Sequence, residues 1–223
     1  MALENDGVRV RVGTVTLDGN LAIPAGARAI VVFAHGSGSS RHSARNRHVA
    51  RVLNGAGLAT LLLDLLTPDE EQIDMQTGHL RFDVPLLADR VISAAEWLVA
   101  APRTERLRVG YFGASTGAAA ALIAAAKRPH AVHAVVSRGG RPDLAGDSLP
   151  DVRVPVLLIV GGNDHDVIEL NREASARLGG EKKLVIVPGA SHLFEEPGTL
   201  EAVAQLARGW FELYLIGAGR EAA

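Results

Sequence analysis

A serine between two glycines is the first feature of this sequence that indicates chemistry. Ser115 lies in the pentapeptide GASTG at residues 113–117, which follows the apolar run 108–112 and precedes an alanine-rich segment. A G-x-S-x-G pattern between a strand and a helix makes a tight turn, and its glycines let neighbouring backbone pass without a Cβ clash. The turn lifts the hydroxyl off the sheet edge, beside the positive end of the next helix. Ser115 is therefore the candidate nucleophile; the alternative is an ordinary glycine-rich helix start.

The candidate base is a histidine near the end of the chain. A serine hydroxyl needs a base to accept its proton, and histidine usually has that role near neutral pH. His192 closes the segment PGASH at residues 188–192, after the last predicted strand and before the last predicted helix. This places it in a loop at the carboxyl edge of the sheet. Five of the other histidines are interpreted as surface residues: His42, His48, His79, His130 and His133.

The acid that orients the histidine is expected to follow a strand as well. Asp164 is the first carboxylate after the apolar run 154–160, and it lies between Ser115 and His192 in the sequence. This order of serine, aspartate and histidine is the one used by α/β sheets with such an elbow. The carboxylate fixes the imidazole tautomer and stabilises the imidazolium. Asp166 is the rival, and Asp164 is preferred because it is nearer the strand end.

Neither a metal site nor a cofactor is predicted. His165 between two aspartates would suit a metal pair, but no third ligand follows at a suitable spacing. The chain has no cysteine, which excludes disulfides, thiolate catalysis and cysteine-ligated metals.

The segment FAHGSGSS at residues 33–40 is the candidate oxyanion hole. Attack on an acyl carbon creates an oxyanion that preplaced N–H donors must meet. We assign the backbone N–H groups of Ser37 and Thr116 to this role, with His35 as a structural turn residue. The competing interpretation is a phosphate loop. However, Arg41 stands where a dinucleotide fingerprint needs glycine, and no Gly-Lys-Ser/Thr follows.

The elements that must position these residues alternate between strand and helix patterns. Residues 8–12 and 15–23 alternate apolar and polar side chains, as half-exposed antiparallel strands do. Runs that are apolar on both faces, typical of a parallel sheet covered by helices, follow at 29–34, 58–63, 107–112, 131–137, 154–160 and 183–187. Helices are predicted at 44–54, 83–99, 116–127, 168–178 and 199–215.

These patterns predict an α/β fold in one domain over residues 1–223, with 216–223 as a frayed tail. The sheet is doubly wound and mostly parallel, with an antiparallel N-terminal start. Ligands of such sheets bind beyond the carboxyl ends of the strands, where all the candidate site residues lie.

Composition restricts the partners. The chain is 48% hydrophobic with a formal net charge of −2, which argues against nucleic acid as a partner. The first residues lack the basic and apolar regions of a secretory signal, and the longest apolar stretch, 117–126, is about half a bilayer span. We expect a cytoplasmic protein without a membrane partner; the oligomeric state is left open.

With these motifs in this order, the sequence resembles the α/β-hydrolase superfamily over nearly its whole length. It is most similar to the compact dienelactone hydrolase-like branch, which has no large cap domain. The matching segments are 35–38, 113–117, 162–164 and 191–194. Dienelactone hydrolases proper use a cysteine nucleophile, whereas this chain has Ser115 there. The resemblance therefore implies a serine esterase rather than an enzyme for dienelactone itself.

The expected function is hydrolysis of ester or related acyl bonds of small substrates through an acyl-enzyme. An acyltransferase or perhydrolase using the same triad is chemically adjacent, and a non-catalytic binding or regulatory protein could retain the fold. Arg138, at a predicted strand end, is a candidate ligand for a substrate carboxylate. The alternative is a salt bridge to Asp143, to Asp147 or in the neighbourhood of Asp164. The acidic segment 65–82 either overhangs the site as a flap or is a solvated connection.

Overall fold

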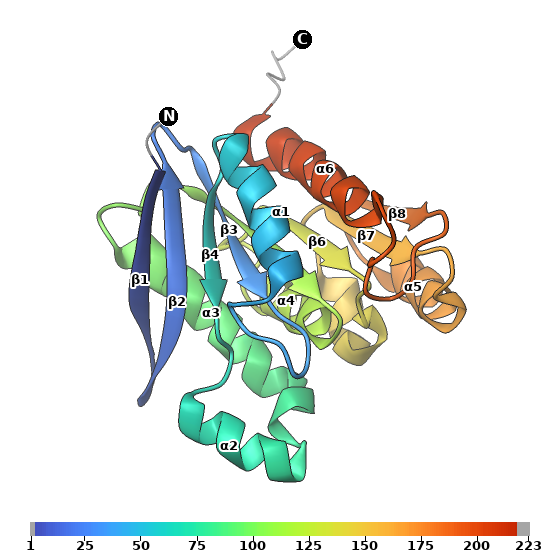
Figure 1. Cartoon of the computed structure of the whole chain (residues 1–223), viewed down its shortest axis with the longest axis horizontal. Helices are drawn as coiled ribbons and strands as arrows, with labels where there is room; N and C mark the ends of the chain where they lie inside the picture. Colours follow the sequence, from blue (N-terminus) through green and yellow to red (C-terminus); the bar gives the residue numbers. More distant parts are fainter. Residues whose placement is uncertain (1–2, 218–223) are drawn as a thin grey trace.

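The computed structural model describes residues 3–217, which are built around an eight-stranded sheet (Figure 1). The strands are β1 (Leu3–Val12), β2 (Val15–Pro24), β3 (Ala29–Ala34), β4 (Ala59–Leu63), β5 (Arg108–Ala114), β6 (Ala134–Arg138), β7 (Val156–Gly161) and β8 (Lys182–Val187), in the order β1-β2-β4-β3-β5-β6-β7-β8. Strand β2 runs antiparallel to β1 and β4, and all other neighbours are parallel. The predicted mostly parallel sheet with an antiparallel start is confirmed.

Helices cover both faces of the sheet. They are α1 (Ala44–Gly55), α2 (Pro68–Thr77), α3 (Val84–Ala100), α4 (Thr116–Lys127), α5 (His165–Arg177) and α6 (Thr199–Phe211). Strand β3 shows why its sequence is apolar throughout: Ile30 and Val32 pack in the core beneath α3 and α4, whereas Val31 and Phe33 pack beneath α1 and α6. Each face therefore buries alternate residues of the same strand.

The segment predicted as an acidic loop, residues 65–82, is folded. It contains α2 and a short 3-10 helix, η1 (Leu80–Phe82). Helix α2 has a capping box, in which the Thr67 hydroxyl accepts from the Glu70 N–H and the Glu70 carboxylate accepts from the Thr67 N–H. Gly78 ends the helix with φ 67°. The Glu70 carboxylate also accepts from Arg90 of α3 at 2.7 Å, which fastens α2 to the body of the protein.

A second helical stretch was not predicted. It is the 3-10 segment η2 (Pro142–Asp151), which connects β6 to β7. No large cap domain is inserted between these strands in the described part of the chain, as the resemblance implied.

The C-terminal prediction was partly wrong. Residues 216 and 217, predicted to be frayed, belong to a π-helical turn, η3 (Glu212–Gly217), that continues α6. Residues 218–223 of the predicted tail lie outside the described residues. Within residues 3–217, each helix is either too short or too polar to span a bilayer. The single-domain organisation of residues 1–223 stays a prediction.

Candidate active site

Ser115 occupies a strained turn between β5 and α4. Its φ of 50° and ψ of −123° lie in a region that side-chain-bearing residues rarely adopt, at a cost of about 1–3 kcal/mol. Hydrogen bonds hold the turn: the Ser115 N–H donates to Arg138 O at 3.4 Å, and Ser115 O accepts from the N–H groups of Ala118 and Arg141, each at 3.1 Å. The side chain is half-buried and reaches the surface. The local structure is thus the predicted strand–turn–helix elbow.

The flanking glycines are required by close backbone contacts. A Cβ on Gly117 would lie 2.2 Å from Ala34 O, and one on Gly113 would lie 2.4 Å from Ala118 Cα. Real Cβ atoms do not approach backbone so closely, so both positions exclude larger residues. The G-x-S-x-G pattern therefore reflects how tightly α4 packs on the ends of β3 and β5.

Replacing Gly117 by alanine is expected to lower the free energy of unfolding by about 2 kcal/mol or more, because the new Cβ would push backbone away from backbone. Gly209 in α6 offers a matched control, since a Cβ there meets no atom within 4 Å. Gly209→Ala should stabilise the protein by about 0.5–1 kcal/mol through helix propensity. Urea denaturation of both variants tests this, and equal stabilities of Gly117→Ala and wild type would contradict it.

Asp164 and His192 are in direct contact. His192 Nδ1 lies 2.6 Å from Asp164 Oδ2, and because a carboxylate only accepts, Nδ1 carries the proton. This leaves Nε2 of the neutral ring free to accept a proton. The His192 side chain is 38% exposed and that of Asp164 15%, so the acid is sheltered while the base remains accessible. The structure places the rival Asp166 in the exposed first turn of α5.

Backbone contacts between two loops bring this pair together. The Asn163 N–H donates to Ala190 O at 2.9 Å, and its side-chain amide donates to Gly189 O at 2.9 Å. A Cβ on Gly161, at the end of β7, would lie 2.4 Å from Ala190 O. The loop after β7 and the loop after β8 are therefore packed backbone against backbone.

Glu196 is a residue of this site that sequence analysis missed. Its carboxylate accepts from the Ser191 N–H at 3.0 Å, directly before His192, and this hydrogen bond is the main reason that the pKa of Glu196 is lowered. Phe194, in the same loop, is buried and has φ 56°, a second strained residue. The sequence offered one signal for this contact, because Glu196 follows Ser191 by only five positions within the loop between β8 and α6.

The end of β6 adjoins both Ser115 and His192. Arg138 O accepts from Ser115 N–H, as described, and a Cβ on Gly139 would lie 3.6 Å from His192 Nδ1. Within the described residues, the Ser115 hydroxyl makes no hydrogen bond, and so none to His192. The structure therefore brings Asp164 and His192 together and leaves the Ser115–His192 contact unformed. In ligand-free enzymes such contacts are often long and tighten when substrate binds.

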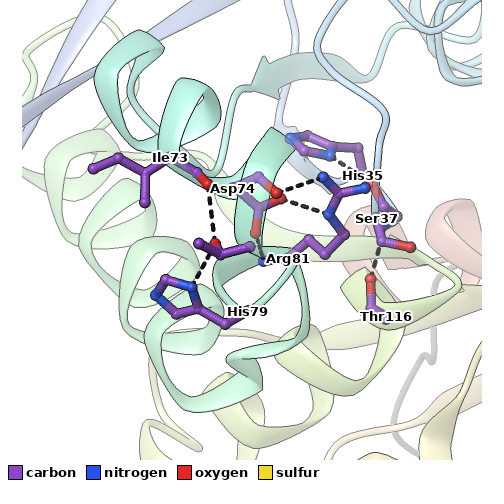
Figure 2. A network of polar contacts seen from close by, with 9 residues as sticks. His35, Ser37, Ile73, Asp74, His79, Arg81 and Thr116 are labelled. Carbon is purple, nitrogen blue, oxygen red and sulfur yellow. Dashed lines mark hydrogen bonds and ion pairs between the residues drawn. The ribbon is translucent and has the colours of Figure 1, made fainter.

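The segment assigned to the oxyanion hole lies against the nucleophile. A Cβ on Gly36 would lie 3.0 Å from Ser115 Cβ. The Ser37 N–H, one of the two predicted donors, points at the side chain of the other predicted residue: it donates to Thr116 Oγ1 at 3.0 Å (Figure 2). The two residues are thus adjacent, but the Ser37 N–H already has an acceptor, which the sequence did not predict.

His35 has the geometry of the structural residue that the sequence suggested. It is buried, its Nε2 accepts from the Leu65 N–H at 3.0 Å, and Nδ1 therefore carries the proton and donates to Gly36 O at 2.9 Å. Burial lowers the pKa of His35, which favours the neutral ring that both contacts require. His35 thus connects the loop after β3 to the segment after β4.

A cavity of about 680 Å³ opens between the loop 35–43 and the folded segment 65–82. Its walls combine the serines of that loop with Leu65, Leu66 and Met75. Arg81 also lines it and is held in place by Asp74, which accepts from Arg81 Nε at 2.5 Å (Figure 2). Helix α2 therefore overhangs the predicted oxyanion segment. Of the two roles considered for residues 65–82, this position favours a flap over a solvated connection.

Arg138 does not form the salt bridge considered as its alternative role. Asp143 is bound by Arg141 at 2.7 Å, and Asp147 by Arg177 at 3.1 Å. That interpretation was wrong. Within the described residues, Arg138 has no acidic partner.

The environment of Arg138 is unusual for a cation. The residue is only 7% exposed, its Nε is buried without a hydrogen-bond partner in the described part of the chain, and its guanidinium carbon lies 6.0 Å from the centre of the Phe194 ring. Burial, and secondarily the charge of Arg45, lower the pKa of Arg138 to about 10. A buried guanidinium without a counter-ion is costly.

Two relatives resemble the chain over nearly its whole length. The crystal structure of a dienelactone hydrolase from Anabaena variabilis is 62% identical, with a TM-score of 0.95, covering 96% of this chain and 100% of that one. A Mycobacterium tuberculosis protein provisionally named a phosphoribosyl transferase is 59% identical over 97% of this chain. The chain spans 48% of that relative's length. Est1E from Butyrivibrio proteoclasticus, 16% identical with a TM-score of 0.77 over 92% of this chain and 97% of its own, shares the fold.

The model of the dienelactone hydrolase family matches residues 17–212, a range that begins within β2, extends through α6 and contains every candidate site residue. The match agrees with the α/β-hydrolase fold and with the strand–turn–helix elbow at Ser115. The chain belongs to the dienelactone hydrolase family.

Proposed function

We propose that this protein is a serine hydrolase that cleaves ester or related acyl bonds of small substrates. Ser115 is the nucleophile, His192 the general base and Asp164 the acid that orients it. The observation that carries the proposal is the 2.6 Å contact between Asp164 and His192, at the same sheet edge as the strained Ser115 elbow. Membership of a hydrolase family supports the reaction class.

The proposed reaction has two halves. Ser115 Oγ attacks the acyl carbon while His192 Nε2 takes its proton, and Asp164 stabilises the imidazolium without taking the proton itself. The tetrahedral intermediate collapses to an acyl-enzyme, and His192 gives the proton to the leaving alcohol. Water, deprotonated by His192, then releases the acid and restores the Ser115 hydroxyl. Acyl transfer to an alcohol or peroxide differs only in which molecule attacks the acyl-enzyme.

A non-catalytic role is the contrasting proposal. A non-catalytic role would not explain the backbone strain at Ser115, because such strain is usually retained at sites where it contributes to function. Phosphoribosyl transfer, named for the longer mycobacterial relative, is not proposed for this chain, because the arrangement of Ser115, His192 and Asp164 suits acyl chemistry.

A fluorophosphonate probe tests the proposed function. Such probes phosphonylate activated serines, and mass spectrometry of the folded protein is expected to find one adduct, on Ser115. Heat-denatured protein is the control, because a serine activated only by the fold loses its reactivity on unfolding. An unlabelled folded protein, together with no turnover on a panel of activated esters and lactones, would favour the binding role.

The environment of Arg138 indicates which class of ester the protein would prefer. The buried guanidinium lacks a counter-ion among the described residues, and the backbone oxygen of the same residue accepts from the Ser115 N–H. A carboxylate on the substrate would supply the missing charge through a charge-assisted hydrogen bond. We therefore propose that the preferred esters carry a carboxylate on their acyl chain.

Replacing Arg138 by methionine, which keeps much of the buried volume, is expected to lower kcat/KM about tenfold for a mono-4-nitrophenyl ester of glutaric acid, the loss of roughly 1.4 kcal/mol of binding. The uncharged 4-nitrophenyl butyrate should change much less. Arg106→Met is the control, because the Arg106 side chain is 93% exposed. Equal losses on both esters would show that Arg138 supports structure rather than binding.

A further inference from the structure

The hydrogen bond between Ser37 and Thr116 bears on which groups would donate to the oxyanion, because the Ser37 N–H was one of the two predicted donors. Thr116 follows the nucleophile directly and is buried, with 3% of its surface exposed. Its Oγ1 accepts from the Ser37 N–H at 3.0 Å, so this amide is directed at a side-chain oxygen instead of open space. Within the described residues, the Thr116 hydroxyl has no acceptor for its own proton.

We propose that the Thr116 hydroxyl is an oxyanion-hole donor, and that the Ser37 N–H acts through it by holding its oxygen. This inference rests on the proposed serine hydrolase function. A hydroxyl that accepts a hydrogen bond is polarised and becomes a stronger donor. Because Ser37 occupies one lone-pair direction of Oγ1, the hydroxyl proton must point away from Ser37.

The position of Thr116 at the start of α4 supports this role. The first N–H groups of a helix have no intrahelical acceptor, so the Thr116 N–H is also available at this end of α4. The N–H and the O–H belong to one residue, directly after Ser115, and two donors so close can converge on one oxygen. The positive end of the helix dipole adds to the same field.

The loop that carries Ser37 is held in a fixed position beside Ser115. The packing of Gly36 against Ser115, where a Cβ would lie 3.0 Å from Ser115 Cβ, leaves little room for the loop to shift inward. His35 fastens its other side to Leu65. The Ser37 N–H is therefore a fixed anchor for the Thr116 hydroxyl.

The proposed step involves no proton loss from Thr116. As Ser115 Oγ bonds to the acyl carbon, the carbonyl π pair moves to the oxygen, which accepts hydrogen bonds from the Thr116 N–H and O–H. When the intermediate collapses, this pair reforms the carbonyl and the leaving alcohol departs with the proton held by His192. The Thr116 hydroxyl donates more strongly to the oxyanion than to the ground-state carbonyl, so its contribution appears in kcat.

Thr116→Val, which replaces the hydroxyl by a methyl group of similar size, tests the proposal. The expected result is a fall of about 100-fold in kcat on 4-nitrophenyl butyrate, with KM changed less than about threefold. The inhibition constant of a trifluoromethyl ketone, whose serine adduct carries an oxyanion, should rise by a similar factor. Thr116→Ser keeps the hydroxyl and should recover most of both losses.

Thr104→Val is the matched control for removal of a buried threonine hydroxyl. Thr104 is 1% exposed and donates to Leu98 O at 2.6 Å, before the amino end of β5 and so away from the catalytic edge. It should lower the melting temperature without changing kcat. Thermal unfolding of Thr116→Val shows whether the variant is folded, and fluorophosphonate titration gives its active fraction, to which kcat is normalised.

The outcomes separate this inference from the proposed function. An unchanged or raised kcat in Thr116→Val, or an unchanged ketone affinity, would overturn the role of the hydroxyl while labelling of Ser115 still supported a hydrolase. A raised kcat would mean that the hydroxyl blocks the hole. If wild-type protein is neither labelled nor active on esters, the proposed function fails and the inference fails with it.

Discussion

Replacement of Ser115 by alanine is expected to reduce kcat on a small activated ester by about 10,000-fold to 1,000,000-fold, as removal of a triad serine does in other hydrolases. Alanine removes the only atom that can form the acyl-enzyme and retains the Cβ. The backbone strain at φ 50° is therefore the same in the variant. Stability should change little, and the loss should lie in kcat rather than in folding.

The measurement is steady-state hydrolysis of 4-nitrophenyl butyrate, with circular dichroism to compare thermal unfolding. Ser93→Ala is a suitable control, because Ser93 is a half-buried serine of helix α3 that donates only to Asp89 O. It should retain wild-type turnover. If Ser115→Ala keeps more than about one tenth of the activity after purification from contaminating esterases, another residue is the nucleophile.

Strong patterns in the sequence predicted the framework of the protein accurately. Strand β3 and helix α4 begin and end at the predicted residues, 29–34 and 116–127. The first is apolar on both faces and the second is alanine-rich, so local preference and burial agree. Strand β6 was predicted at 131–137 but begins at Ala134, because Val132 is buried in the core although it lies before the strand.

Helix α2 was missed because it has no apolar stripe. Only Asp74 among its residues is buried, and periodicity therefore gave no signal. The signals were at its ends: Thr67 and Glu70 form the capping box, Pro68 stands at the first position, and Gly78 follows. Helix α5 was predicted from residue 168 but begins at His165, since Asp164 already stands at its N-cap position.

Chain order was enough to pair Asp164 with His192, but it did not predict how the oxyanion segment meets the nucleophile. The Ser37–Thr116 hydrogen bond joins residues 79 positions apart through a backbone donor, which carries no sequence signature. The sequence also did not predict that Arg138 lacks an acidic partner among the described residues. The aspartates near it in the sequence form ion pairs with other arginines. Both features depend on which side chains meet in space.

Asp164→Asn is expected to reduce kcat by about 10,000-fold while the protein stays folded. The carboxylate now accepts from His192 Nδ1 at 2.6 Å. An amide can present its NH₂ group to this nitrogen, which favours the tautomer with the proton on Nε2. A protonated Nε2 cannot take the proton of Ser115, and the imidazolium also loses its counter-ion.

Asp166→Asn separates this effect from a general effect of charge. Both substitutions remove one negative charge near the start of α5, and neither removes a helix cap, since the Asp164 side chain makes no capping hydrogen bond and the Ile168 N–H is bound by the Asp164 backbone oxygen. Asp166 is exposed, so its variant should keep kcat within about twofold. Paired kcat measurements on one ester decide between the two aspartates. A large loss in Asp166→Asn with a small one in Asp164→Asn would transfer the orienting role to the rival carboxylate, and would require the loop after β7 to rearrange when substrate binds.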